Sequence, residues 1–230
     1  MTMRTDPSEI AEIFDAEVRD PEAFEELGPR YNVAPTQPVT VVLQRGDEGR
    51  FVELHRWGLV PPWAESIGIG ARMINARAET VATMPAFRAS FLKWRCVIPA
   101  DGFYEWRREG KAKKPFHIHT ADDRPLAFAG LWAPWRDPST GDWLLSASVV
   151  TTAANSVVGE LHNRMPAVLG PDEWPLWLDP QITDPGLLSD LLHPADDELL
   201  RLDAASPLVN NANNEGSDLL VPEPALTLFG

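Results

Sequence analysis

Short, mostly apolar runs recur through the first two thirds of the chain, and residues 51–57 alternate apolar and polar positions. Alternation with a period of two is typical of strands that bury one face. The Ala100-Asp101-Gly102 segment has the composition of a turn between two such runs. We therefore expect strands at residues 39–43, 51–57, 95–99, 103–106, 116–120, 126–132 and 143–151.

Helical signals are fewer and shorter. Asp6, Pro7 and Glu9 combine a capping residue, an early proline and an early acid, which predicts a helix from Ser8 to Phe14 or Val18. Many short strands with scattered helices indicate an α+β fold, built on a bent antiparallel β-sheet or barrel with short flanking helices. The other short helices are expected at residues 155–161, 171–177 and 184–192.

Length and composition limit the domain organisation. A chain of 230 residues with 44% hydrophobic residues can bury one sizeable core. We expect a single domain at residues 1–205. Residues 206–230 begin polar and Asn-rich, and they are expected to form a tail packed on the domain or extending from it.

The charge and cysteine content exclude several classes of protein. The net charge of −14 argues against diffuse binding to nucleic acid, because phosphate contacts need cations. Eight bases against three acids at residues 88–114 nevertheless allow a nucleic-acid partner at one face, or a merely solvated rim. Cys96 is the only cysteine, so a disulfide or cysteine metal cage is excluded. We expect no metal, no cofactor, no membrane span and a cytoplasmic location.

Three polar clusters interrupt otherwise apolar sequence, at residues 75–79, 99–106 and 162–166. An unpartnered polar group costs roughly 1–3 kcal/mol when it is buried. The clusters are therefore interpreted as parts of one active site contributed by distant segments.

Two residues of these clusters suit acid–base chemistry. Glu105 stands between Tyr104 and Trp106, and desolvation there would raise its pKa toward that of a general acid. A structural ion pair with Arg77 is the alternative. His162 opens a polar turn and could move a proton, although a lone histidine is more often structural.

Other residues suit the binding of a phosphorylated ligand. Asn75 and Arg77 have the spacing of one strand face, so Arg77 could grip a phosphate while Asn75 orients a reacting group. Glu79 could instead neutralise Arg77. Asn32, near Pro35, could line the same pocket. Two tryptophans, Trp57 and Trp63, would be stacking platforms if they are exposed and core residues if they are buried.

In this order the motifs resemble those of the SOS response-associated peptidases, also known as abasic-site processing proteins. The resemblance covers nearly the whole chain. It rests on Tyr-Asn-Val-Ala-Pro-Thr-Gln (31–37), Arg-Trp-Gly-Leu-Val-Pro-Pro-Trp (56–63), Ile-Asn-Ala-Arg-Ala-Glu-Thr (74–80), Arg-Cys-Val-Ile-Pro-Ala-Asp-Gly-Phe-Tyr-Glu-Trp (95–106), His-Asn-Arg-Met-Pro (162–166) and Ser-Pro-Leu-Val-Asn-Asn (206–211).

The resemblance implies a DNA-damage function. Such proteins bind single-stranded DNA, or a junction with duplex, that carries an abasic site. A cysteine exposed by removal of the initiator methionine captures the sugar aldehyde, first as a Schiff base and then as a thiazolidine. The product is a covalent DNA–protein crosslink, and the peptidase name refers to a proposed self-processing of the N-terminus.

Carried over to this chain, the resemblance assigns each candidate a role. Glu105 and His162 would be the acid–base pair, while Asn32 and Asn75 would position the amine and the sugar. The DNA-binding residues would be Arg77, Arg164, Arg4, Trp57 and Trp63.

The beginning of the chain departs from the pattern. The family begins Met-Cys-Gly-Arg, whereas this chain begins Met1-Thr2-Met3-Arg4. The internal Cys96 has no adjacent free amine and cannot replace the missing thiol. We expect that a few residues, the cysteine among them, are missing from the start.

Two alternatives stay open within the family. A free Thr2 amine could form a Schiff base without closing a stable ring, which would make the protein an abasic-site lyase. The protein could instead bind the lesion without a covalent step. A small-molecule hydrolase outside the family has little support, because no Gly-x-Ser-x-Gly motif and no metal-ligand spacing are present.

The expected partner is single-stranded DNA with abasic sites, bound by a monomer that associates with the nucleoid during repair. The terminal Leu226-Thr227-Leu228-Phe229 faintly resembles a peptide that docks on a replication clamp. A simple hydrophobic tether is the alternative interpretation of that end.

Overall fold

The computed structural model describes residues 1–110 and 112–222. Its α-helices are short and its strands carry most of the long-range contacts. The elements, in chain order, are α1 (Pro7–Phe14), β1 (Ala16–Val18), α2 (Pro21–Leu27), β2 (Pro38–Gln44), β3 (Arg50–Trp57), β4 (Asn75–Arg77), α3 (Arg88–Lys93), β5 (Arg95–Ala100), β6 (Phe103–Glu109), β7 (Ala112–Thr120), β8 (Leu126–Arg136), β9 (Trp143–Ala153), α4 (Ser156–Gly159), β10 (Arg164–Pro166), α5 (Trp174–Leu178), α6 (Pro185–Asp190) and β11 (Leu200–Ala204).

A closed barrel forms the centre of the molecule. Strands β3, β2, β5, β8 and β9 follow one another in antiparallel pairs, and a parallel pairing of β3 with β9 closes the ring. The short strands β1, β4 and β10 extend the same sheet beyond the ring. This is the α+β barrel with short flanking helices that the sequence predicts.

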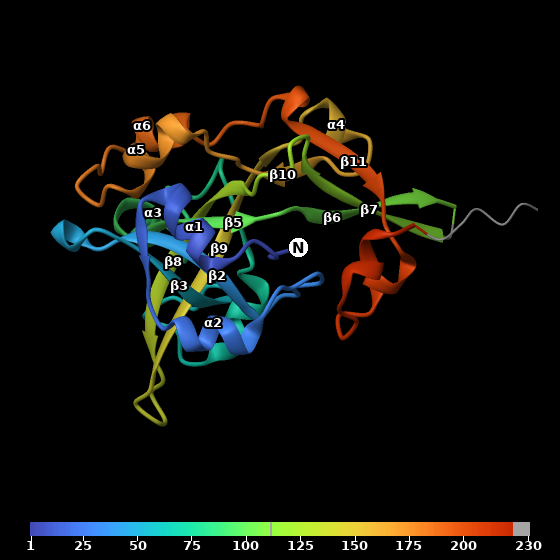
Figure 1. Cartoon of the computed structure of the whole chain (residues 1–230). Coiled ribbons are helices and arrows are strands. Elements are labelled where there is room, and N and C mark those ends of the chain that lie inside the picture. Colours follow the sequence, from blue (N-terminus) through green and yellow to red (C-terminus); the bar gives the residue numbers. More distant parts are fainter. Residues whose placement is uncertain (111, 223–230) are drawn as a thin grey trace, which may run out of the picture.

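The alternation of the strands separates two cores. On one face of each strand, residues such as Val97 and Leu131 pack against the helical residues Phe14, Phe91 and Trp177, so this face is the outside of the barrel. On the other face, Val41, Cys96, Ile98, Phe128 and Val149 pack together inside the barrel. Figure 1 shows the helices gathered around the outside.

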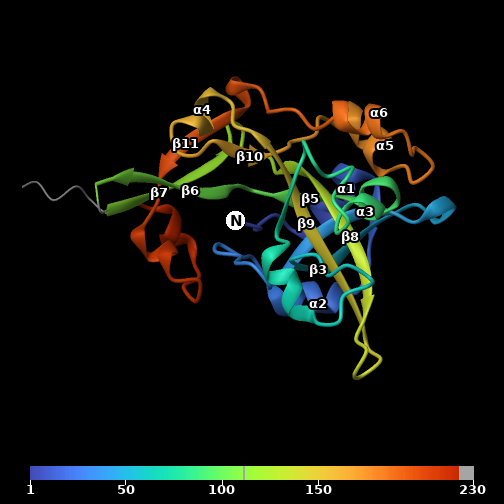
Figure 2. The same cartoon turned by 180° about the vertical axis from the view of Figure 1, so that it is seen from behind.

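A second sheet extends to one side of the barrel, in the order β11-β7-β6. The segment Asp101-Gly102 carries the chain from β5 into β6 of this sheet, so β5 and β6 are not partners in one hairpin. Figures 1 and 2 show β6 and β7 extending away from the barrel, at the end of the molecule opposite to α3, α5 and α6.

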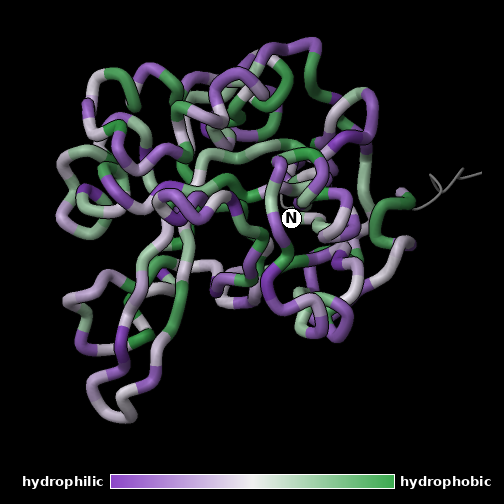
Figure 3. The backbone as a smooth tube through the Cα atoms, turned by 60° about the vertical axis from the view of Figure 1, so that its left-hand side comes forward, coloured by the Kyte–Doolittle hydropathy of each residue, from purple (hydrophilic) through white to green (hydrophobic). Residues whose placement is uncertain are grey.

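The N-terminal segment lies inside the molecule. Figure 3 shows this end surrounded by other segments of the chain rather than at the periphery. Thr2 pairs with Gly102, Met3 pairs with Arg30, and the α-amino group of Met1 donates to the carbonyl of Val33 at 2.9 Å. Burial lowers the pKa of this amino group to about 5.

The segment that follows β11 packs on the 30–33 loop. The carboxylate of Glu215 accepts hydrogen bonds from the backbone N–H groups of Tyr31 and Asn32, at 2.7 and 3.1 Å. The Asn32 amide donates to the carbonyls of Val209 and Asn211. Residues 206–222 are therefore fastened to the domain, whereas the clamp-like residues 226–229 lie outside the described residues.

A charged cluster of Arg45, Glu53 and His55 lies on the inner face of β3. Arg45 donates two hydrogen bonds to the Glu53 carboxylate, at 3.0 and 2.8 Å, and His55 Nε2 donates a third at 3.1 Å. Burial alone would raise the pKa of Glu53, but these bonds outweigh it and lower the pKa to about 2. Burial lowers the pKa of His55, which is therefore neutral at pH 7.

Most expected elements are present with shifted ends. The first helix stops at Phe14, and β1 occupies the residues to Val18. Strands β6, β7 and β8 run longer than the alternation indicated, because they continue into exposed hairpins. The sequence interpretation missed α2, α3 and the strands β1, β10 and β11, although Asp20-Pro21-Glu22 repeats the start signal that predicted α1. The spacing of Asn75 and Arg77 indicated β4.

Candidate active site

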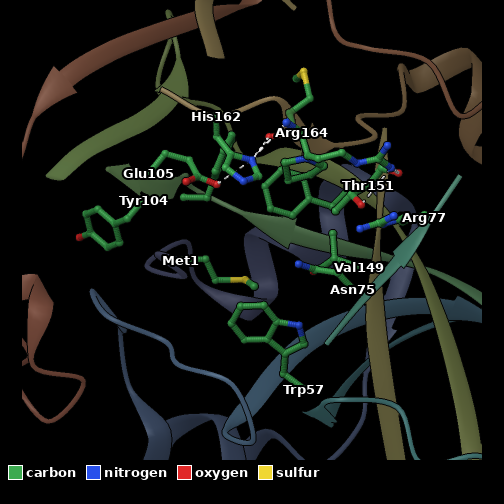
Figure 4. A pocket seen from close by; sticks show the side chains of 14 residues that line it. Met1, Trp57, Asn75, Arg77, Tyr104, Glu105, Val149, Thr151, His162 and Arg164 are labelled. Atoms are coloured by element: carbon green, nitrogen blue, oxygen red, sulfur yellow. Dashed lines mark hydrogen bonds and ion pairs between the residues drawn. The ribbon is translucent and has the colours of Figure 1, made fainter. Parts of the chain in front are cut away.

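A cavity of about 340 Å³ opens where the barrel meets the second sheet. Figure 4 shows polar side chains converging on it from β4, β6 and the segment around β10. Apolar residues of the barrel interior make the floor, so polar groups in the cavity have a partly desolvated setting. Its lining residues are Met1, Trp57, Asn75, Arg77, Phe103, Tyr104, Glu105, Phe128, Val149, Thr151, His162, Arg164, Met165 and Pro166.

Glu105 projects from β6 into this cavity. Its side chain is 25% exposed, and Oε1 lies 3.9 Å from Nδ1 of His162. Burial raises the pKa of the carboxyl, and the nearby imidazole opposes the shift without cancelling it. The carboxyl is thus a candidate proton donor, and the alternative pairing with Arg77 does not form.

His162 is held by its own loop. After α4 the chain turns, and Nδ1 of His162 lies 3.1 Å from both the backbone N and the backbone O of Arg164. The imidazole is half exposed, and it faces Glu105 across the cavity (Figure 4). A ring anchored at one nitrogen can exchange a proton through the other.

Arg164 is committed to protein partners. Its guanidinium donates to both oxygens of Glu79, at 2.5 and 3.0 Å, and also to Thr151. Hydrogen bonds from Arg164 lower the pKa of Glu79. The role expected for Glu79 therefore differs, because its ion pair is with Arg164, while Arg77 acts on it only as a nearby charge.

Arg77 and Asn75 reach the cavity from the same face of β4, as their spacing predicted. Strand β4 runs parallel to β9, which places Asn75 beside Val149 and Arg77 beside Thr151. Within residues 1–110 and 112–222 neither side chain has a hydrogen-bond or ion-pair partner. A cation and an amide without partners at a cavity are suited to an anionic, hydroxylated ligand.

The comparisons with known proteins agree on one family. The sequence profile of the SOS response associated peptidases matches residues 1–212. The chain belongs to this family. It is 40% identical to the abasic site processing protein YoqW of Bacillus subtilis, over 95% of this chain and 96% of that one. Against the abasic site processing protein YedK of Escherichia coli it is 32% identical, over 84% of each chain.

A solved structure gives the same result for the fold. A protein from Bacteroides thetaiotaomicron superposes with a TM-score of 0.87 at 27% identity, over 97% of this chain and 98% of that one. The barrel and its second sheet are thus the fold of a SOS response associated peptidase.

Four expected site residues of this family member lie outside the cavity. Thr2 is fully buried, and its hydroxyl lies 3.0 Å from Nε2 of His117. The side-chain amide of Asn32 donates to the carbonyls of Val209 and Asn211. Arg4 lies beside Asp101 and over the Tyr31 ring. Trp63 is 60% exposed and lines no part of the cavity.

The remaining tryptophan lines the cavity, whereas the cysteine lies away from it. Trp57 forms a wall of the cavity, and its indole N–H donates to the carbonyl of Ile74 at 2.9 Å. Cys96 is buried inside the barrel, and burial raises the pKa of its thiol far above the usual range. The cavity's lining contains neither lysine nor cysteine.

Sequence reasoning missed Met1, Tyr104, Val149 and Thr151 as lining residues. Val149 and Thr151 carried a usable signal, because the period of two places both on one face of the same expected strand. In the described part of the chain, no three His, Cys, Asp or Glu residues gather as metal ligands. None of the described helices is long and apolar enough to cross a bilayer.

Proposed function

We propose that this protein processes abasic sites in DNA, with the sugar of the lesion bound in the cavity between Glu105 and His162. Relatives that carry the name abasic site processing protein support the assignment. The observation that carries it is the pairing of a carboxyl of raised pKa with an imidazole 3.9 Å away, beside the unpartnered Arg77.

An abasic deoxyribose is a cyclic hemiacetal, and opening its ring needs an acid and a base. The carboxyl of Glu105 donates its proton to the ring oxygen as the bond from that oxygen to the anomeric carbon breaks. The imidazole of His162 takes the proton of the anomeric hydroxyl. The products are an aldehyde, a free hydroxyl, the carboxylate of Glu105 and the imidazolium of His162.

Arg77 binds the phosphate next to the lesion. A guanidinium makes two parallel hydrogen bonds to phosphate, and Arg77 has no competing partner in the described chain. Arg164 contributes less to phosphate binding than the family resemblance implied, because Glu79 already neutralises it.

The covalent step occurs at the N-terminal segment. Met1 lines the cavity, whereas the lining contains no lysine or cysteine and Cys96 is sealed in the barrel. A nucleophile carried by this segment attacks the aldehyde carbon, and water leaves when an imine forms.

The test is capture of an abasic-site oligonucleotide, followed on denaturing gels with and without borohydride. We expect a crosslink that maps to the N-terminal peptide. Glu105→Gln should slow capture by about 10²- to 10³-fold, since it removes a positioned acid. Glu109→Gln, on the same strand but paired with Lys114, should behave like the parent.

The outcomes separate the candidate mechanisms. A crosslink stable without borohydride indicates capture by amine and thiol together. One seen only with borohydride, alongside strand cleavage, indicates a Schiff-base lyase. Tight binding with no covalent product would contradict the covalent step, and equal rates for both glutamate variants would contradict the role of Glu105.

A further inference from the structure

A second cavity adjoins the first on the β6–β7 hairpin. Its volume is about 410 Å³, and it shares Glu105 and His162 with the candidate active site. A ligand that extends beyond the first cavity across these two residues would enter the second. The lining residues are Glu105, Trp106, Arg107, Arg108, Lys113, Glu160, Leu161 and His162.

The cations of this second cavity differ in their partners. Arg107 is neutralised by Glu160 at 2.9 Å and lies over the Phe116 ring. Arg108 and Lys113 stand directly opposite each other on β6 and β7, and neither has an acidic partner in the described part of the chain.

Two like charges directly opposite each other on neighbouring strands destabilise a hairpin. The hairpin places them together on a protein whose net charge is −14 and whose acids outnumber its bases by 34 to 20. The repulsion between the two cations therefore destabilises the hairpin, and no acidic side chain of the described residues offsets it. A bound anion would remove this repulsion.

We propose that Arg108 and Lys113 bind backbone phosphates of the DNA strand as it leaves the candidate active site. The inference rests on the proposed function for the identity of the strand. It adds a path: the strand runs from the cavity at Glu105 along the hairpin, and these two cations neutralise its phosphates. Arg95, of the same 88–114 segment, does not share this role, since it is buried among backbone carbonyls of α3 and of residues 177–182.

The experiment measures binding of two single-stranded oligonucleotides that carry a stable abasic analogue, one of about 12 nucleotides and one of about 3. The parent is compared with Arg108→Ala/Lys113→Ala over a range of salt concentrations. The matched control is Arg88→Ala/Lys93→Ala, which removes two exposed cations from α3 at the opposite end of the molecule (Figures 1 and 2).

For the longer oligonucleotide, loss of two phosphate contacts should reduce the slope of log affinity against log salt by about 1.4. The ratio of the parent's affinity to that of Arg108→Ala/Lys113→Ala should consequently fall roughly 7-fold between about 50 and about 200 mM salt. The control Arg88→Ala/Lys93→Ala and the charge-conserving variant Arg108→Lys/Lys113→Arg should both keep the parental slope. The short oligonucleotide should bind equally to the parent, Arg108→Ala/Lys113→Ala and the control.

An unchanged slope for Arg108→Ala/Lys113→Ala would overturn the inference, and so would an equal loss on the short oligonucleotide. The proposed function is judged separately, by whether the parent prefers the abasic oligonucleotide over an intact one. A reduced slope without that preference supports the strand path along the hairpin and contradicts recognition of abasic sites. A preference with an unchanged slope supports recognition of abasic sites and contradicts the strand path.

Discussion

Replacing Glu53 by Gln tests whether the charged cluster on the inner face of β3 stabilises the fold. The side chain is 8% exposed and accepts three hydrogen bonds from Arg45 and His55. Glutamine has nearly the same shape but lacks the charge, so it leaves Arg45 without its counter-ion. Removing one partner of a buried pair costs about 3–5 kcal/mol.

The pKa of Glu53 gives a second estimate of this magnitude. A fall from 4.5 to about 2 corresponds to about 3 kcal/mol of stability at pH 7. Because the folded-state pKa is depressed, this stability is fully present above the unfolded-state value and is lost as the pH falls through 4.5 toward 2. At a pH of about 3.5 roughly 2 kcal/mol should remain.

The assay is urea unfolding of the parent and of Glu53→Gln at pH 7 and at a pH of about 3.5, with the free energy of unfolding taken from the midpoint and slope. We expect a gap of about 3 kcal/mol at pH 7 that narrows by about 1 kcal/mol at the lower pH. Glu48→Gln is the control, since Glu48 is 70% exposed beside Arg19 and should change stability by less than about 1 kcal/mol. A gap that is the same at both pH values would refute the reasoning.

Three further outcomes are expected at the candidate active site. Arg77→Ala should weaken binding of an abasic oligonucleotide about 10- to 100-fold, because one charge-assisted contact is lost. The control is Arg88→Ala, and a titration that gives both variants the same affinity for the oligonucleotide would contradict this. Glu79→Gln should slow capture about 10-fold, since Glu79 fixes Arg164 beside His162. The variant should change stability little, because the Glu79 side chain is 55% exposed. Unaltered single-turnover rates would exclude Glu79 as a positioning residue. The capture rate should fall as the pH rises through the raised pKa of Glu105, because the proton-donating form is lost, and Glu105→Gln should abolish this limb of the pH profile.

The strands of the barrel could be predicted because each is a short, largely apolar run bounded by turn residues. Alternation marked β3, whereas β5 and β8 are nearly continuous apolar runs because both of their faces are buried. The spacing of Asn75 and Arg77 indicated β4, whereas the three residues of β10 are too few for a period to be recognised. Both strands pair with β9. Closure of the ring depends on the pairing of Arg56 and Trp57 with Ser146 and Ala147, and no local pattern records so distant a contact.

Part of the candidate site could be predicted, because polar residues within apolar sequence indicate a binding or catalytic role. Glu105, His162, Asn75 and Arg77 do meet at one cavity. Asn32 carries the same signal but lies outside the lining of this cavity, where its amide donates to carbonyls of the packed C-terminal segment; sequence alone does not distinguish the two placements. The choice of Arg164 over Arg77 as partner of Glu79 depends on side-chain placement across β9, which spacing along the chain does not reveal.

The hydrogen bonds of Glu215 have a consequence for synthesis of the protein on the ribosome. Tyr31 and Glu215 are 184 positions apart, so the loop at residue 31 waits for its fastening until nearly the whole domain has emerged. At 5–20 residues per second the wait is roughly ten to forty seconds. During that time the nascent chain lacks one support of its N-terminal segment, which lines the cavity. A chain still in translation would consequently be a poor competitor for damaged DNA, and reactivity would appear only with the finished molecule.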